Sequence, residues 1–589
     1  MSGAAAPAVP LATAARPARA RSAGWIGLAL AAPVTFWLLA AFAAPLAAVV
    51  LLSLQEAADP FGPLLQAPSL AQYAALVADP FYLRVVGETL LLGAGVTALT
   101  VLLGFPLALW LVRLPARWRA LGFAVILIPL LTNVVVRSLG IALLLAPDGL
   151  LNGVLTTLGL PPLRGLLYTH GAVAIALAQV FMPFLVLALY DALQATSPRV
   201  HEAAESLGAS RPMRVLLVDL PLSLPGLRSG IVIVFLMAST AYVSATLLGG
   251  KKVWTTGMLV WQEALQNLNA PLASALALVM TGASTLFALA VHAIWRRLMP
   301  WTQGTPSVQA RAARAWSPPV PLVRAVDLLG PAVGRLLLAL ALALLLLPLV
   351  LVLVQSFNDV PQATVAGFRA FTLRWYERAL FGGAYADAFL VSAKLALASA
   401  AVALALALPA AFALGRRRFR GLAALAAFWT LPLSMPHVAI GVGMLRLLQA
   451  FTAVPPFLGL MAVHVVLMLP FAIALLHTSV EGLDRVQEEA AASLGAGAVR
   501  RFLLVVIPGL APGLAAAAIM SFLLSFGEVT VTSFLTTARM TTLPVRIYAE
   551  ASFSLEPTVH AVSALLIAAT VLALACLNRL VRLDRLYAR

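Results

Sequence analysis

The sequence predicts an all-α membrane protein with about twelve transmembrane helices, arranged as two parallel repeats of six helices. Three observations predict this fold class: an apolar composition, a series of long apolar runs, and a hydrophilic segment that occurs twice. Of the 589 residues, 62% are hydrophobic and only 10% are charged, whereas soluble domains carry about 25% charged residues. The composition therefore places the chain in the membrane class before any motif is considered.

A transmembrane helix needs about 20 predominantly apolar residues. Several of the apolar runs are longer than a bilayer requires, so tilted helices or short re-entrant pieces are expected among them. Twelve runs meet the length requirement, at 25–54, 86–112, 121–146, 171–192, 229–248, 272–295, 333–355, 386–414, 422–449, 458–477, 513–534 and 559–578.

The basic residues predict the orientation of these spans. The formal charge of +17 would suit a nucleic-acid-binding protein, but the Lys and Arg residues form short clusters between the apolar runs. Such clusters are typical of cytoplasmic loops. With the N-terminus inside, every inside loop is basic, including "RRRFR" at 416–420. We therefore expect contact with membrane lipid, no nucleic-acid partner, and both termini in the cytoplasm.

Composition also predicts the domain boundaries. Residues 1–24 are expected to form a disordered cytoplasmic tail, because they are rich in Ala and Pro and contain no acidic residue. The apolar run after them is too long for a cleaved signal peptide. A Pro-, Ser- and Arg-rich stretch at 299–331 is expected to be a cytoplasmic linker between two domains, 25–298 and 332–589. The single cysteine, Cys576, excludes an internal disulfide and a cysteine-based metal site.

The repeated segment reads "HEAAESLGASRPMRVLLVDLPLSLPG" at 201–226 and "EEAAASLGAGAVRRFLLVVIPGLAPG" at 488–513, with equivalent residues 287 positions apart. Six spans per half is an even number, so both halves have the same orientation. This predicts a parallel repeat around a pseudo-twofold axis along the membrane normal, with a path between the halves.

Each copy is expected to form two short helices with a bend, lying across the cytoplasmic face. Pro198 or Asp484 begins the segment, and Gly208 or Gly495 ends the first, Ala- and Glu-rich helix. A second short helix then leads to Pro221 or Pro508, just before the next span. An ordinary connector, stabilised by arginines that reach lipid phosphate, remains the alternative. Two copies with the same spacing favour a functional module.

The pattern Glu-Ala-Ala, three residues, Gly, nine residues, an aliphatic residue, one residue, Leu/Ile-Pro resembles the EAA loop of ATP-binding cassette (ABC) importer permeases. The resemblance covers essentially the whole chain, which is similar to two permeases fused head to tail, with loops at 198–226 and 484–513. It assigns contact with an ATPase to Glu202, Ala203, Ala204, Gly208, Pro221, Glu489, Ala490, Ala491, Gly495 and Pro508.

This resemblance implies the type I ABC importer permease fold and a location in the bacterial inner membrane. It implies two copies of a cytoplasmic ATPase subunit, which would bind ATP and Mg²⁺, and a periplasmic or extracellular solute-binding protein. The chain itself would bind no cofactor and would not be an enzyme. No P-loop or metal-binding motif occurs in the sequence, in agreement with an energy source on a partner chain.

An ion-driven secondary transporter is the alternative from a different class. Such a protein needs ionisable groups along a proton or sodium path inside the spans. The sequence shows no obvious relay among the six candidates, Arg137, Lys394, Arg446, His437, His464 and Glu528.

Five residues are candidates for the substrate path. Glu528 could pair with a cationic amine or make a packing hydrogen bond, and Arg137 could bind an anionic group or form a structural ion pair. His437 follows Pro436 in a Pro- and Gly-containing run that suggests a broken helix lining a cavity. Tyr242 and Trp261 could bind a cation through their ring faces. For each residue, a packing role is the alternative.

The solute is suggested by resemblance alone. The segments at 371–380, 129–140 and 182–193 are similar to those of spermidine/putrescine-type permeases, which favours a polyamine. "SFGEV", at 525–529, departs from the acidic pair of polyamine permeases at this position. Import of ferric iron, thiamine or 2-aminoethylphosphonate by the same architecture remains the alternative, and the fused arrangement is familiar from those branches.

Overall fold

The computed structural model describes residues 18–56, 67–250, 252–298, 320–363, 366–416, 419–433, 435–537, 540–554 and 556–581. These residues form helices joined by turns and loops, with two isolated β-bridges. Eleven helices are long and apolar enough to cross a membrane, or twelve if the bent pair Leu422–Leu433 and His437–Ala450 is one span. The predicted fold class, an all-α membrane protein of about twelve spans, is confirmed.

The helices of the first half follow the chain from the N-terminal span to the sixth span. They are α1 (Ala18–Leu38), the π-helix η1 (Leu39–Ala43), α2 (Ala44–Ser53), α3 (Ala71–Ala78), α4 (Pro80–Arg113), α5 (Ala116–Leu131), α6 (Val134–Leu145), α7 (Leu150–Thr157), α8 (His170–Gln194), α9 (Pro198–Ser206), α10 (Arg211–Arg214), the π-helix η2 (Val215–Asp219), α11 (Leu220–Ser239), α12 (Val243–Gly249), α13 (Thr256–Leu265) and α14 (Ala270–Leu298).

The second half repeats this order. Its helices are α16 (Val320–Gln355), α17 (Arg374–Phe381), α18 (Ala384–Arg416), α19 (Leu422–Thr430), the 3₁₀-helix η4 (Leu431–Leu433), α20 (His437–Ala450), α21 (Pro456–Glu481), α22 (Arg485–Ser493), α23 (Ala498–Arg501), the π-helix η5 (Phe502–Val506), α24 (Ile507–Gly527), α25 (Thr532–Leu535), α26 (Leu543–Ala549), the π-helix η6 (Glu550–Ser554) and α27 (Thr558–Val581).

Two helices begin earlier than the domain prediction implies. Residues 1–17 of the expected tail and 299–319 of the expected linker lie outside the described residues. The helix α1 already begins at Ala18, and α16 begins at Val320, inside the range expected for the linker. The apolar runs that predicted these two spans are therefore shorter than the helices, because each helix begins in a segment that contains arginines.

Several spans are broken, as the length of the apolar runs suggested, although only the break near His437 was placed from the sequence. The run 121–146 consists of α5 and α6, which are separated at Thr132 and Asn133. The run 422–449 bends by 94° between η4 and α20, as the Pro and Gly residues before and after His437 suggested. The fifth and eleventh runs break after Ser239 and after Gly527. Non-helical backbone at membrane depth is tolerated where protein buries it or where it lines a cavity, so each break is expected to meet one of these two conditions.

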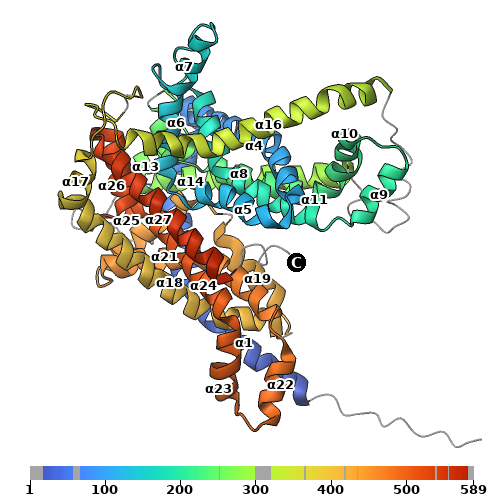
Figure 1. Cartoon of the computed structure of the whole chain (residues 1–589). Coiled ribbons are helices and arrows are strands. Elements are labelled where there is room, and N and C mark those ends of the chain that lie inside the picture. The colour runs from blue at the N-terminus through green and yellow to red at the C-terminus, as the bar shows by residue number, and fades with distance from the viewer. Residues whose placement is uncertain are drawn as a thin grey trace, which may run out of the picture.

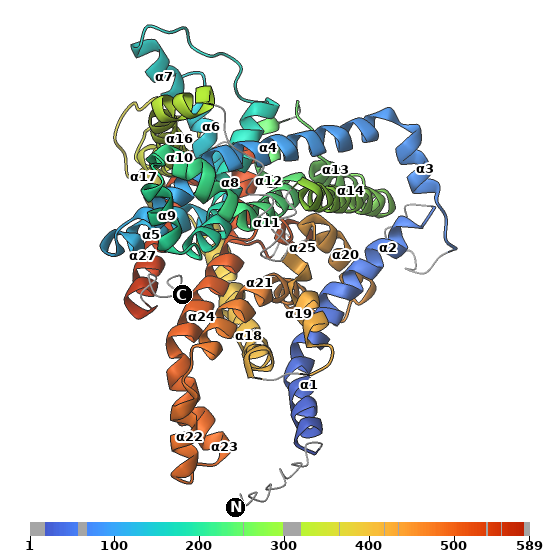
Figure 2. The same cartoon turned by 90° about the vertical axis from the view of Figure 1, so that its right-hand side faces the viewer.

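The two halves exchange their first spans. The helices α1 and α2 pack against α18, α19 and α20 of the second half, and α16 packs against α4, α5 and α6 of the first half. Both views show this exchange, with the blue α1 among orange helices and the yellow-green α16 among cyan and green helices (Figures 1 and 2). The halves therefore form one interlocked body with the broken helices at its centre.

Candidate functional site

The first helix of each predicted cytoplasmic loop forms as expected. In the first copy α9 begins with Pro198, and in the second copy Asp484 caps α22 by accepting a hydrogen bond from the amide of Val486 at 2.9 Å. Both helices end before a glycine in the left-handed region, Gly208 with a φ of 80° and Gly495 with a φ of 83°. A side chain at such a φ is strained, so glycine gives each loop the same bend.

The second part of each loop differs from the prediction of a separate short helix. The helix α10 continues through the π-helical turn η2 into α11, and α23 continues through η5 into α24. Pro221 and Pro508 do not end the helix, because each lies within two residues of a π-helical turn, η2 or η5, where the regular backbone hydrogen-bond pattern is already changed. Each bend is therefore joined to a span by continuous helix rather than by a flexible connector.

The same face is exposed in both copies of the loop. Glu202 and Ala203 are exposed while Ala204 is half-buried, and Glu489, Ala490 and Ala491 lie on the equivalent helix with a similar pattern. The most exposed large apolar side chains of the loops are the leucines directly before the two glycines. Leu207 is 87% exposed and Leu494 is 88% exposed. A large apolar side chain is thus exposed at the same place in both repeats.

The two loops lie apart at the ends of their own halves. In Figure 1, α9 and α10 lie at the right-hand end of the molecule and α22 and α23 lie at its lower end. Figure 2 shows α22 and α23 projecting below α18 and α24. The two copies of the loop therefore present two separate surfaces of similar composition.

A cavity of about 170 Å³ lies between the halves at the helix breaks. The first half contributes an apolar wall that includes Leu177, Ala241 and Tyr242, and the second half contributes His437 and Thr530. Two of the five predicted path residues, Tyr242 and His437, therefore line the same cavity.

The carboxylate of Glu528 caps the short helix α25. It accepts hydrogen bonds at 2.9 Å from the amide of Val531 and at 2.9 Å from that of Thr532, and at 2.5 Å from the hydroxyl of Thr532. Glu528 itself is half-buried, and it precedes the cavity-lining Thr530 by two residues. Glu528 is therefore in the same helix break as a lining residue, but it is not among the described residues that line the cavity, and its oxygens bond within their own chain segment.

His464 extends this polar group, which is a connection that the sequence did not reveal. Its ring is fully buried and forms hydrogen bonds to Ser525 at 2.8 Å and to Thr532 at 2.9 Å. Ser525, His464, Thr532 and Glu528 thus form a hydrogen-bonded chain within the second half. The expectation of no relay among the ionisable residues is incomplete in this respect, because Thr532 joins two of them.

Arg137 lies behind the cavity wall rather than in it. Its side chain is buried and donates from Nη1 to the carbonyl of Val180 at 3.4 Å, and Val180 lines the cavity. The residue before α6, Asn133, caps that helix and also donates to the carbonyl of Gly527 in the second half at 3.1 Å. The break in one half is thus bonded to the break in the other.

Tyr242 lines both the central cavity and a second cavity of about 440 Å³, which is called the outer cavity after the predicted orientation of the spans. It is 2% exposed and donates a hydrogen bond to the hydroxyl of Tyr548 in the other half at 2.8 Å. Trp261 stacks on Tyr242 with ring centroids 5.6 Å apart and also lines the outer cavity. The structure therefore brings the predicted pair together and adds Tyr548.

Tyr548 and Thr530 were not singled out from the sequence. Tyr548 occurs in "MTTLPVRIYAEA", which aligns with the Trp261 region of the first half, so the repeat contained a signal for it. Thr530 is two residues from Glu528 and carries no such signal. Its position depends on the helix break after Gly527.

The chain is similar to known transport proteins. Residues 403–583 match the family model of the binding-protein-dependent transport system inner membrane component. The spermidine/putrescine transport system permease protein PotB of Haemophilus influenzae is 34% identical over 220 residues, which cover 37% of this chain and 76% of PotB. PotB of Escherichia coli is 31% identical over 215 residues, covering 36% of this chain and 78% of that protein.

Two further similarities are weaker. PotC of H. influenzae, also a spermidine/putrescine transport system permease protein, is 28% identical over 214 residues and covers 36% of this chain and 83% of PotC. A bacterial alginate ABC transporter, solved with an alginate-bound periplasmic protein, has a TM-score of 0.39 and 18% identity and covers 46% of this chain and 95% of that chain. On the family match and the extent of the PotB similarity, the chain belongs to the binding-protein-dependent transport system inner membrane components, the multi-pass permeases of ABC importers.

Proposed function

We propose that this chain supplies both permease units of one ABC importer and forms the translocation path for a polyamine such as spermidine or putrescine. Each PotB relative matches little more than a third of this chain along about three quarters of its own length. One chain with two such units would replace two separate permeases. The domains would be 25–298 and 332–589.

Docking of two ATPase subunits is supported by one observation above the others, the equivalent exposure of Leu207 and Leu494. These leucines are 87% and 88% exposed at the two bends. In water each would cost free energy in proportion to its apolar area, which burial in a partner groove would recover. The glutamates and alanines named above lie on the helices next to these leucines. ATP and Mg²⁺ would bind to the partner subunits.

Coupling would follow from the continuous helices. A displacement of the bend at Gly208 passes through α10 and η2 into α11, and that at Gly495 passes through α23 and η5 into α24. These two spans end at the breaks that border the central cavity. ATP-driven approach of the ATPases would therefore move the cavity walls and shift the equilibrium between outward and inward access.

The solute would enter from an external binding protein through the outer cavity and the aromatic group of Tyr242, Trp261 and Tyr548. Aromatic ring faces attract ammonium groups, and the negative charge of Glu528 lies next to the central cavity. His437 and Thr530 offer polar contacts there. Arg137, behind the wall, would shape the path rather than touch the solute. This arrangement suits a small organic cation with a hydrocarbon chain.

Transport with the complete system in proteoliposomes tests the proposal. We expect ATP-dependent uptake of labelled spermidine or putrescine that requires the external binding protein. Uptake of thiamine, 2-aminoethylphosphonate or ferric ion with no response to polyamines would show that the proposed solute is wrong. The assignment as an ABC importer would not be affected. Uptake that continues without ATP but stops when the proton gradient is collapsed would instead support a secondary transporter working through His464 and Glu528.

A further inference from the structure

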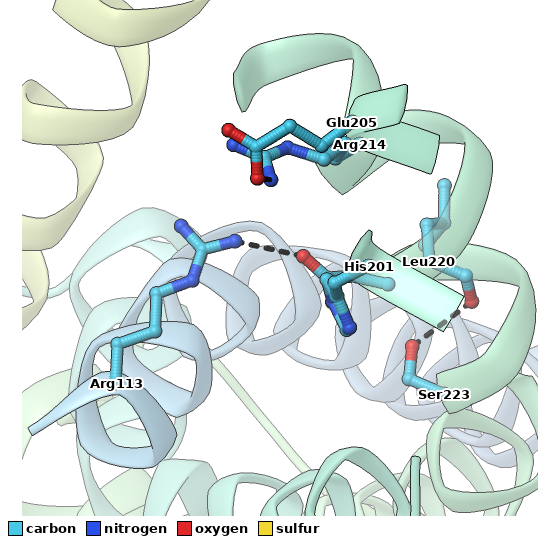
Figure 3. A network of polar contacts seen from close by, with 7 residues as sticks. Arg113, His201, Glu205, Arg214, Leu220 and Ser223 are labelled. Atoms are coloured by element: carbon cyan, nitrogen blue, oxygen red, sulfur yellow. Dashed lines mark hydrogen bonds and ion pairs between the residues drawn. The ribbon is translucent and has the colours of Figure 1, made fainter. Parts of the chain in front are cut away.

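The first coupling loop, α9 to η2, is tied to the cytoplasmic end of the second span by a carboxylate with two partners. Arg113, the last residue of α4, places Nη2 2.8 Å from Oδ2 of Asp219, and His201 on α9 donates from Nε2 to Oδ1 at 2.7 Å. Figure 3 shows Arg113 reaching from its helix toward the loop that carries His201. The side chain of Asp219 is only 5% exposed, whereas those of Arg113 and His201 are 54% and 34% exposed.

In the second coupling loop, α22 to η5, an arginine at the equivalent place forms an ion pair, without a hydrogen bond, with a different acid. Arg416, the last residue of α18, places Nη2 3.1 Å from Oε1 of Glu488 on α22 and donates to the carbonyl of Leu483 at 3.0 Å. The side chains of Arg416 and Glu488 are 15% and 31% exposed. The arginine again joins the end of the second span to the first helix of the loop.

The acidic residue that pairs with the arginine lies at different positions in the two copies of the loop. His201 is equivalent to Glu488, and Asp219 is equivalent to Val506, which is buried. The first half thus has histidine on the loop helix and the acid in the π-helical turn, whereas the second half has the acid on the loop helix and valine in the turn. The arginine is common to both halves although its partner differs.

Exposed ion pairs at helix ends often contribute little to stability. Asp219, Arg416 and Glu488 are only 5%, 15% and 31% exposed, however. Removing one partner from a partly buried pair leaves an uncompensated charge. The Arg214–Glu205 pair, at 2.8 Å, offers a comparison, because it joins α9 to α10 within the loop and reaches no second span. Arg113 and Arg416, by contrast, connect their loops to α4 and α18.

We propose that Arg113 and Arg416 are positioning residues that make each coupling loop move as one body with the second span of its half. This inference rests on the proposed role of the loops in binding the ATPases. The chain already joins each loop to the fourth and fifth spans, and α4 packs on α8 and α11 as α18 packs on α21 and α24. The arginine adds a contact between the loop and the second span at the cytoplasmic ends of these helices. A displacement of the loop would therefore move the second, fourth and fifth spans together instead of bending the loop.

The second half provides the design of a rescue experiment in the first half. Asp219→Val removes the acid and leaves Arg113 and His201 without their partner. Asp219→Val combined with His201→Glu installs the residues of the second half, so the introduced glutamate can pair with Arg113 as Glu488 pairs with Arg416. Arg113→Gln provides a milder break, since the Arg113 side chain is 54% exposed. Arg84→Gln, which breaks an exposed pair with Glu88 at the other end of α4, is the matched control.

Hydrogen exchange of the full chain in lipid nanodiscs measures the tie without any partner protein. We expect amides of α9 to exchange roughly tenfold faster in Asp219→Val and in Arg113→Gln, because charged hydrogen bonds are among the stronger ones that oppose local opening. The double variant should return to within about twofold of the wild type, and Arg84→Gln should not change α9. Equal exchange rates in all variants would show that Arg113 does not hold α9 in place. Failure of the double variant to restore protection would show the same.

Coupling is measured as spermidine imported per ATP hydrolysed in proteoliposomes with the complete transporter. The single variants should lower this ratio while keeping ATP hydrolysis, and the double variant should restore it. An unchanged ratio in variants with faster exchange would overturn the positioning role. Failure of the wild-type chain to recover an ATPase would instead reject the proposed function, and the exchange result would still show whether the arginines hold the loops.

Discussion

Gly140 of the first half lies directly against the carbonyl oxygen of Pro348 of the second half, so that a Cβ on Gly140 would be 2.2 Å from that oxygen. Gly443 stands in the same relation to Pro45, also at 2.2 Å. The glycines belong to the broken helices α6 and α20, and the prolines to the exchanged first spans. The reciprocal contact seats each broken helix against the opposite half.

Replacing either glycine should weaken the interlock of the halves. Gly140→Ala and Gly443→Ala should each destabilise the protein by about 1–3 kcal/mol, because a backbone carbonyl must move to admit the methyl group. Thermal unfolding of the purified chain, followed by loss of the monodisperse peak, measures this. Gly95→Ala and Gly282→Ala are the controls, since nothing lies within 4 Å of their Cβ positions. Equal stability of all four variants would contradict the close contact.

These glycine pairs also show what the sequence could not reveal. The repeated loops are 287 positions apart, but Gly140 and Gly443 are separated by 303, as are Pro45 and Pro348. The segment with α7, between α6 and α8, is longer than its counterpart between α20 and α21. An alignment extended backwards from the loops therefore loses register between the fourth and the third span. It does not align Gly140 with Gly443 or Arg113 with Arg416.

The span composition and the loop module were predictable because they depend on local physics: apolar length, helix propensity and the glycine at each bend. The breaks at Asn133 and after Gly527 were not, because the side chain of Asn133 in one half donates to the backbone carbonyl of Gly527 in the other half. Nothing in either local sequence specifies that partner. The same reason hid the capping of α25 by Glu528 and the link from Thr532 to His464.

The exposed leucines should carry much of the ATPase contact. Leu207→Ser and Leu494→Ser should each reduce recovery of the ATPase with the affinity-purified chain, and the double variant should nearly abolish it, since each leucine loses about 1.5–3 kcal/mol of apolar burial at the interface. Stability of the chain alone should not change, because both side chains are almost fully in solvent. Leu160→Ser, an exposed leucine near α7, is the control. Undiminished recovery in the double variant would place the docking surface elsewhere.

The loop glutamates make a separate prediction. Glu202→Lys together with Glu489→Lys should reduce ATPase recovery and should do so more strongly at low salt, because exposed charges are screened as ionic strength rises. Glu205→Lys is the control within the first loop, since its partner Arg214 lies in the same loop. Assembly and uptake unaffected by the double charge reversal would remove the glutamates from the contact.

Tyr242 should act as the barrier between the outer and central cavities. Tyr242→Ala removes a buried ring that lines both cavities and its hydrogen bond to Tyr548, so we expect leakage of labelled putrescine into proteoliposomes without ATP. Tyr242→Phe keeps the ring and loses only the hydrogen bond, with a cost of about 0.5–1.5 kcal/mol in stability and no leak. A stable Tyr242→Ala variant that does not leak putrescine would show that other residues form the barrier.

Glu528 should affect both stability and solute affinity. In Glu528→Gln an amide group replaces one of the two oxygens that cap α25, so stability should fall by about 1 kcal/mol. The loss of negative charge beside the cavity should also raise KM for spermidine uptake. Ser525→Ala, which breaks the hydrogen bond to His464 without changing charge, should lower stability and leave KM unchanged. The same KM in both variants would limit Glu528 to capping α25.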